Sequence, residues 1–230
     1  MESSLYSARH LEYAYDWNGK AVPVLRGLDL ELEAGCFCCI VGPSGTGKTT
    51  LLNLLGLIDS PTKGQLLFCG EDLTKATETQ REHIRLRKVG FIFQAFHLIP
   101  TLSVLENTSY FLPLLGHSPE SSRKIAMETL DLLGLKDHWN KKPLELSGGQ
   151  RQRVAVARAI AKRPAVVLAD EPTANLDSET AERMIGAFKE LQSSSKTSFI
   201  FSTHDSHLVS YAKKIYRMKD GRFENEGSDR

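Results

Sequence analysis

Gly42-Pro43-Ser44-Gly45-Thr46-Gly47-Lys48-Thr49 is the stretch that decides the fold of this chain of 230 residues. It matches the pattern G-x-x-x-x-G-K-[ST] at every fixed position. Residues 37–41 before it are apolar, as in a buried strand, and residues 50–55 after it carry an apolar face, as in a helix. A glycine-rich loop between a strand and a helix directs backbone N–H groups and the positive helix end at phosphate. The stretch therefore predicts a nucleotide-binding site.

Two side chains of this loop carry specific chemistry. Lys48 would reach the β and γ phosphates, and the Thr49 hydroxyl would hold Mg²⁺, an ion that prefers oxygen ligands. A glycine-rich turn with no ligand is the alternative. The Lys48-Thr49 pair and the flanking strand and helix favour the nucleotide site.

Composition and charge give no indication of a nucleic-acid-binding, membrane-spanning or secreted protein. Lys and Arg total 29 against 28 for Asp and Glu, so the net charge gives no reason to expect nucleic acid as a partner. Glu78 and Glu82 are interspersed among the basic residues of 78–88, which favours a solvated helix face over a polyanion site. The longest apolar run spans 36–41, whereas crossing a bilayer takes roughly 18 residues. Because the start also lacks the features of a secretion signal, we expect a cytoplasmic protein.

The four cysteines, Cys36, Cys38, Cys39 and Cys69, do not form a metal-binding pattern. Successive side chains of a strand point to opposite faces, so Cys38 and Cys39 cannot share one ion. No second Cys or His pair follows at a spacing that zinc requires. We expect buried, reduced thiols that pack as small apolar side chains, as in a reducing compartment.

The segment before the loop predicts two antiparallel strands, at about 5–15 and 22–32, joined at Asn18-Gly19. Tyr13, Tyr15 and Trp17 lie close together there. Their spacing is compatible with a ring that stacks on a nucleotide base and, equally, with aromatic packing in a half-buried strand.

Polar residues that could contact a nucleotide follow three further predicted strands. They are Gln94 after 89–93, Asp170 and Glu171 after 165–169, and His204 after 198–202. An open parallel sheet binds ligands at the carboxyl ends of its strands, so we expect these residues in one site with Lys48. Asp170 would hold Mg²⁺ through water, Glu171 would orient or deprotonate the attacking water, and His204 would contact the γ-phosphate.

Between these strands the chain predicts helices. The pattern is helical over 102–133, with a helix start at Ser118-Pro119-Glu120 and a stop at Gly134. Residues 96–100 are apolar, which fits either a docking surface or an ordinary core loop.

Leu146-Ser147-Gly148-Gly149-Gln150 opens another helix that runs to about residue 162. Ser147 with Gln150 three residues later fits a capping box, which explains the motif as helix initiation. The two glycines also expose backbone N–H groups, which would make the motif a second phosphate contact.

Taken together, these motifs resemble the ATP-binding cassette (ABC) family from residue 15 to about 205. The pentapeptide at 146–150 is the family signature, whereas phosphate loops occur in many ATPases. The resemblance implies an α/β fold: a P-loop NTPase core with a mainly parallel sheet, an N-terminal antiparallel β subdomain and an inserted α-helical subdomain at about 96–163. It implies one nucleotide-binding domain over 1–230 with a polar tail at 219–230.

The resemblance also implies the site residues and the cofactors ATP and Mg²⁺. The ATP-binding residues would be Tyr15, Gly42, Pro43, Ser44, Gly45, Thr46, Gly47, Lys48, Thr49, Thr50, Ser147, Gly148, Gly149, Gln150 and Asp177. The metal ligands would be Thr49, Gln94 and Asp170, and the catalytic residues Glu171, His204, Lys48 and Gln94. Tyr15 would be the residue that stacks on adenine, which leaves Tyr13 and Trp17 as packing residues.

In this family two cassettes enclose two ATP molecules head to tail. Ser147 and Gly149 would then contact the γ-phosphate that the opposite subunit binds. We expect a homodimer, with a related partner subunit as the alternative.

Residues 168–177, 56–59 and 96–100 resemble the lipoprotein-releasing (LolD) and macrolide-export (MacB) group of the family. The resemblance implies an ATPase on the cytoplasmic face of the inner membrane, where integral membrane subunits dock near residues 96–102. Ala174 stands where many members have Gly, and the cysteine-rich strand is unusual. A soluble ATPase that acts on ribosomes or DNA is the alternative, but no paired cassette, coiled coil or zinc module is visible. A binding module without catalysis is a third reading, and every catalytic residue type is present.

Overall fold

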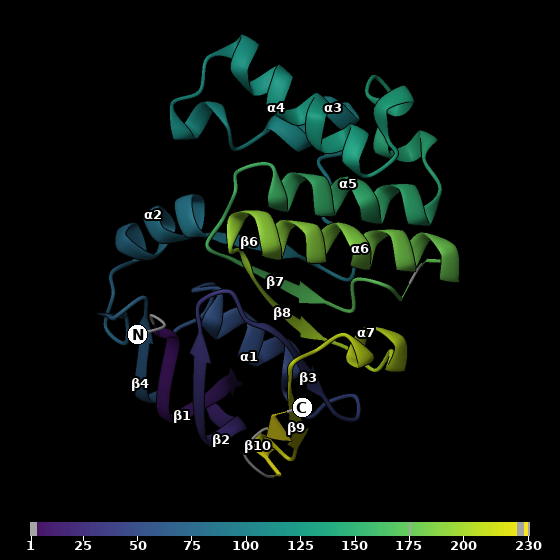
Figure 1. The fold of residues 1–230 in the computed structure, drawn as a ribbon. Coiled ribbons are helices and arrows are strands. Elements are labelled where there is room, and N and C mark those ends of the chain that lie inside the picture. Colours follow the sequence, from purple (N-terminus) through teal and green to yellow (C-terminus); the bar gives the residue numbers. More distant parts are fainter. Residues whose placement is uncertain (1–3, 175, 225–227, 230) are drawn as a thin grey trace.

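The computed structural model describes residues 4–174, 176–224 and 228–229, the last two by their backbone alone (Figure 1). The strands are β1 (Ser4–Trp17), β2 (Lys20–Glu33), β3 (Phe37–Val41), β4 (Lys63–Phe68), β5 (Glu71–Asp72), β6 (Val89–Ile92), β7 (Val166–Asp170), β8 (Ser198–Ser202), β9 (Lys214–Lys219), β10 (Arg222–Phe223) and β11 (Ser228–Asp229). The α-helices are α1 (Lys48–Leu55), α2 (Glu78–Lys88), α3 (Val104–Ser109), α4 (Pro119–Leu132), α5 (Gly148–Ile160), α6 (Ser178–Ser195) and α7 (Ser206–Ser210). Short 3₁₀ helices are η1 (Pro113–Leu115), η2 (Lys136–His138) and η3 (Pro143–Glu145).

Two sheets form the framework of the fold. The antiparallel sheet has the order β2-β1-β4-β5, and the mainly parallel sheet has the order β10-β9-β3-β8-β7-β6. In the second sheet the pairs β6–β7, β7–β8, β8–β3 and β3–β9 are parallel, whereas β10 and β11 pair with β9 antiparallel. The predicted α/β class, with an antiparallel β subdomain and an inserted helical region, is confirmed.

The two faces of the parallel sheet lie in different hydrophobic cores. Figure 1 shows α5 and α6 over one face, with α3 and α4 beyond them, and α1 on the other face beside the antiparallel sheet. Cys39 packs into the core on the α5 side and Cys38 into the core on the α1 side. The predicted opposition of these two thiols is confirmed. Burial raises the pKa of Cys39 to about 12, so this thiol stays protonated and packs as an apolar group.

Several predicted boundaries coincide with observed ones. The strands predicted at 37–41 and 198–202 are β3 and β8, and the charged segment 78–88 is α2. The helix start at Ser118 is also confirmed, since the Ser118 side chain accepts a hydrogen bond from the N–H of Ser121. The helical pattern of 102–133 is interrupted before that start, at Pro113 and at Gly116, whose φ of 90° lies in the left-handed region.

Two predictions were wrong in part. Cys69 is exposed, because it lies in the turn between β4 and β5. Trp17 is 71% exposed at the tip of the β1–β2 hairpin and so is not a packing residue. Within the segment predicted as a polar tail, Phe223 in β10 packs its ring against Tyr216 at a centroid distance of 4.8 Å, and β11 pairs with β9. Residues 225–227 and 230 lie outside the described residues.

No helix within the described ranges combines the length and the apolar character needed to cross a bilayer.

Candidate nucleotide-binding site

The loop between β3 and α1 depends on glycine at two positions. A Cβ on Gly42 would lie 2.2 Å from the carbonyl oxygen of Met218. Gly47 has a φ of 100°, and a Cβ there would lie 3.0 Å from side-chain atoms of Val24 and Leu25. α1 starts directly after Gly47 with no side-chain cap. Its first backbone N–H groups are therefore left without a side-chain acceptor at the helix end that favours an anion.

The reactive side chains of the loop have partners of their own in this structure. The Lys48 ammonium donates to the carbonyl oxygens of Gly42 at 2.8 Å and Pro43 at 3.0 Å. The Thr49 hydroxyl donates to Asp170 Oδ2 at 2.8 Å, so the loop and the end of β7 are directly joined.

One pocket of about 480 Å³ brings most of the predicted residues together. It is lined by Tyr15, Val24, Ser44, Gly45, Gly47, Lys48, Thr49, Thr50, Gln94, Asp170, Glu171, Ser202 and His204. The Tyr15 hydroxyl lies 3.2 Å from Thr50 Oγ1, and the residue is 44% exposed, which leaves ring surface open to a ligand. The pocket lies at the carboxyl ends of β3, β6, β7 and β8, where a parallel sheet binds its ligand.

Glu171 is held tightly at the end of β7. Its φ of 47° is in the left-handed region, and its N–H donates to the carbonyl oxygen of Ser202 at 2.8 Å. The side chain is 13% exposed, with Oε1 2.8 Å from Nδ1 of His204 and Oε2 accepting from Thr203 Oγ1 at 3.3 Å. Strained backbone of this kind persists where the surroundings over-determine it, as happens at functional sites.

The segment after Glu171 is joined to the segment after β8. Thr173 donates its hydroxyl hydrogen to Asp205 Oδ2 at 2.8 Å, and Asp205 also accepts from the N–H of His207. The His204 side chain is 76% exposed. Asn175, in the segment 168–177 that resembles the LolD and MacB group, lies outside the described residues.

The donor set fits Mg²⁺. Thr49 offers a hydroxyl, Asp170 a carboxylate and Gln94 an amide oxygen in the same pocket, and all are hard oxygen ligands. Within the described ranges no group of three or more His, Cys, Asp or Glu could hold a metal by itself.

The signature residues lie elsewhere. Ser147 and Gln150 form the predicted capping box: the Ser147 N–H donates to Gln150 Oε1 at 2.9 Å, and the Gln150 N–H donates to Ser147 Oγ at 3.2 Å. Ser147, Gly148, Gly149, Gln150 and Asp177 are not among the residues that line the pocket. The chain therefore does not bring its own signature to its own phosphate loop.

A family model described as "ABC transporter" matches residues 25–174. The chain belongs to the ABC transporter family. It is a cassette ATPase.

Two named relatives are similar over most of this cassette. A lipoprotein-releasing system ATP-binding protein LolD from Pseudomonas fluorescens is 42% identical over 221 residues, which cover 96% of this chain and 97% of that protein. A macrolide export ATP-binding/permease protein MacB from Syntrophobacter fumaroxidans is 44% identical over 207 residues. Those residues cover 89% of this chain but 29% of the MacB protein.

Two solved structures of the ABC cassette MJ0796 have the same fold. The dimeric structure has a TM-score of 0.92 and 36% identity, with 96% of this chain and 97% of that chain covered. A dimeric post-hydrolysis state bound to ADP and Pi has a TM-score of 0.93 and 35% identity, with 98% of each chain covered.

One residue that the sequence analysis did not assign to a site is Arg158 of this ABC cassette. It is 9% exposed, and its guanidinium donates to the carbonyl oxygens of His97 at 2.6 Å and Phe96 at 3.0 Å. Phe96 and His97 have positive φ values of 63° and 46°. Burial lowers the pKa of Arg158. Arg158 follows buried Val154 by four residues, which places it on the apolar face of α5. This spacing is the sequence feature from which its burial could have been predicted.

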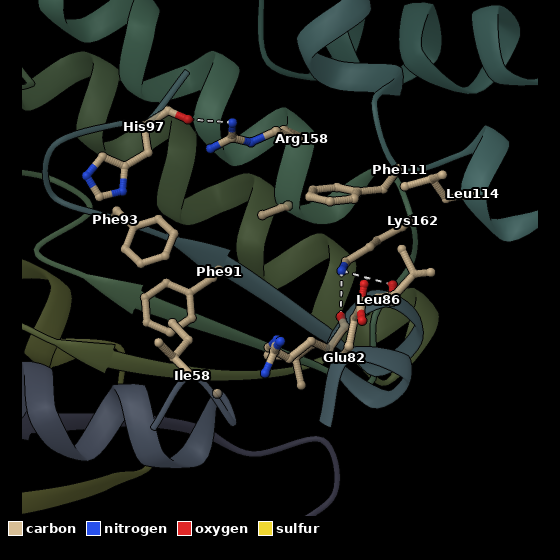
Figure 2. A pocket seen from close by; sticks show the side chains of 14 residues that line it. Ile58, Glu82, Leu86, Phe91, Phe93, His97, Phe111, Leu114, Arg158 and Lys162 are labelled. Carbon is tan, nitrogen blue, oxygen red and sulfur yellow. Dashed lines mark hydrogen bonds between the residues drawn. The ribbon is translucent and has the colours of Figure 1, made fainter. Parts of the chain in front are cut away.

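A second hollow of the ABC cassette, of about 430 Å³, lies between α2, α5 and the loop after β6. Figure 2 shows Phe91, Phe93, Phe111, Leu114 and Ile58 around it, with Lys162 and Arg158 at its edge. We call it the phenylalanine groove. Of the segment 96–102 predicted to dock a partner, His97 lines this groove, while Phe96 and Leu98 are partly buried and Leu98 packs against the core.

Proposed function

We propose that this chain is the Mg²⁺-dependent ATPase subunit of a membrane transport or mechanotransmission complex of the lipoprotein-extraction or export type, and that residues 1–230 act as one nucleotide-binding domain. The observation that carries the proposal is the convergence of Lys48, Thr49, Gln94, Asp170 and Glu171 in one pocket. The similarity to LolD over nearly the whole of both chains supports the transport class.

In the proposed reaction the loop binds the polyphosphate of ATP. Backbone donors of residues 42–49 and the ammonium of Lys48 would stabilise the charge that develops on the transferred phosphoryl group. To do so Lys48 exchanges its bonds to Gly42 and Pro43 for phosphate oxygens. Tyr15 stacks on the adenine ring.

Glu171 is the residue we assign to the attacking water. Its carboxylate accepts hydrogen bonds at the strand end, which suits a base that orients or deprotonates water. His204 is the partner of that carboxylate here, and its exposed ring would turn to the γ-phosphate when ATP is bound.

Mg²⁺ would be held by Thr49, Gln94 and Asp170. When bound, the ion neutralises charge on the β and γ phosphates. The Thr49–Asp170 hydrogen bond of 2.8 Å keeps both ligands at the same point of the pocket in its absence.

The active unit in this proposal is a head-to-tail homodimer. The signature lies outside the pocket of its own chain, which supports the assignment of Ser147 and Gly149 to a nucleotide held by another cassette. The two similar MJ0796 structures are both dimers. ATP would close the dimer, and hydrolysis would reopen it.

The partner in the membrane would dock a cytoplasmic helix in the phenylalanine groove. Its apolar walls suit the apolar face of such a helix. Through this partner the cassette would be held on the cytoplasmic face of the inner membrane.

The proposal is tested by affinity purification of the Glu171→Gln protein from its native cells, with ATP and Mg²⁺ in detergent. The expected co-purifying chain is an integral membrane protein with a large extracytoplasmic domain, identified by mass spectrometry. Recovery of only ribosomal proteins, DNA-associated proteins or the cassette itself would refute the transport assignment.

A second substitution tests the docking site. Leu114 lines the phenylalanine groove and is 60% exposed, so Leu114→Asp should release the membrane protein without unfolding the cassette. Val22 in the antiparallel sheet is 47% exposed and serves as the matched control. Capture that survives Leu114→Asp as well as Val22→Asp would place the docking surface elsewhere.

A further inference from the structure

Ser202, the last residue of β8, has a buried hydroxyl with no hydrogen-bond partner among the described residues. The whole residue is 1% exposed. A buried hydroxyl left unpaired costs about 1–3 kcal/mol, and native proteins keep few such groups. A hydroxyl at this place is explained if it has a partner in another state of the protein.

The fold puts this hydroxyl beside Asp170. Ile200 belongs to the core on the α1 side, and Ser202, two residues further along β8, faces the same side. On β7, Leu168 belongs to that core too, which puts Asp170 on the same side. Ser202 and Asp170 are in-register partners of the parallel pair, so their Cα atoms are about 5 Å apart.

The Asp170 carboxylate can accept a further donor. Its Oδ2 accepts from Thr49 at 2.8 Å, and no hydrogen bond from the described residues reaches Oδ1. A serine hydroxyl reaches different acceptors by turning about one bond between staggered positions. Ser202 and Asp170 also line the same pocket as Thr49 and Glu171.

We infer that Ser202 is a positioning residue for the metal site: its hydroxyl donates to the Asp170 carboxylate once nucleotide and metal are bound. This inference rests on the proposed function, because it takes Asp170 to serve Mg²⁺. With Thr49 on one oxygen and Ser202 on the other, the carboxylate keeps a single orientation toward the ion. Residues that orient a metal-binding group in this way typically change metal affinity by about 10–100-fold when removed.

The test measures Mn²⁺, which carboxylate and hydroxyl sites accept in place of Mg²⁺. Electron paramagnetic resonance follows Mn²⁺ binding to the cassette with a non-hydrolysable ATP analogue, so no turnover is involved. Ser202→Ala should weaken Mn²⁺ binding about tenfold. Ser202→Thr keeps the hydroxyl and should restore most of the affinity. Binding of the analogue without metal should be the same in all three proteins.

Ser198 supplies the matched control. It lies on the same strand and the same face, is 0% exposed, and its Oγ accepts from the N–H of Gly35 at 2.9 Å. Ser198→Ala should lower the urea midpoint of unfolding and leave Mn²⁺ affinity unchanged. Ser202→Ala should weaken Mn²⁺ binding without lowering the urea midpoint, since the substitution removes a hydroxyl that has no hydrogen bond in the absence of metal.

Two failures are distinguishable. Equal Mn²⁺ affinity in the wild-type protein and Ser202→Ala would overturn the role of Ser202 alone. A wild-type protein that binds the nucleotide analogue but no Mn²⁺ beside it would overturn the proposed metal site itself, and the inference with it.

Discussion

Replacement of Arg158 by Met should destabilise the cassette by about 3 kcal/mol. The buried guanidinium donates to two backbone carbonyls, those of Phe96 and His97. Hydrogen bonds from a charged donor contribute about 1.5–3 kcal/mol each. The substitution also removes the free-energy cost of burying the charged guanidinium, and this gain offsets part of the loss. Both carbonyls belong to residues with left-handed backbone in a loop outside any helix or strand. No regular backbone hydrogen bond is therefore available to replace the one that Arg158 donates to each of them.

Urea unfolding followed by circular dichroism measures this effect. With a slope of about 3 kcal/mol per M, the midpoint should fall by about 1 M. Arg163→Met is the control, because Arg163 is exposed, and it should leave the midpoint within about 0.5 kcal/mol of wild type. Arg158→Lys, which keeps the charge without the planar fork, should lie between them. Equal midpoints for Arg158→Met and Arg163→Met would refute the reasoning.

Three further changes test other parts of the structure. Glu171→Gln should keep ATP binding and lower turnover at least about 100-fold in a phosphate-release assay, and near-normal turnover would remove Glu171 from its assigned role. Gly42→Ala should cost at least about 2 kcal/mol in urea unfolding, because its Cβ would lie 2.2 Å from the Met218 carbonyl oxygen. Burial lowers the pKa of Lys162 to about 8 from 10.5. The unfolded chain therefore binds more protons between these values, and stability should rise by roughly 3 kcal/mol across that window, at about 1.4 kcal/mol per pH unit, a rise that Lys162→Met should lack.

Local patterns predicted the phosphate loop and the strands around it well. The glycine spacing of 42–47 and the apolar run of β3 are contained in a dozen consecutive residues, so no distant contact is needed to recognise them. The capping box of Ser147 and Gln150 is local in the same way. The convergence of Gln94 and Glu171 on one pocket follows from a general property of parallel sheets.

Features that depend on where the sheets end could not be predicted. The alternation of apolar and polar residues along β1 continues to Trp17. This pattern does not show that the tip of the hairpin extends beyond the hydrophobic core and leaves Trp17 exposed. Cys69 is exposed for a similar reason, since a turn follows β4. The phenylalanine groove combines Ile58, Phe93 and Leu114 from distant segments, so no single stretch of sequence describes it.

The loop that follows β6 belongs to two sites at once. Gln94 lines the nucleotide pocket, whereas Phe93 and His97, its near neighbours, line the phenylalanine groove. Arg158 fastens this loop to α5. Any ligand that changes the loop's conformation in one site changes the free energy of binding in the other, and linkage makes the effect reciprocal. If occupation of the groove tightens ATP binding tenfold, ATP must tighten occupation of the groove tenfold, about 1.4 kcal/mol in each direction. In the proposed complex the cassette would need no long chain of contacts between the nucleotide pocket and the docked partner, because one short loop would enter both binding equilibria.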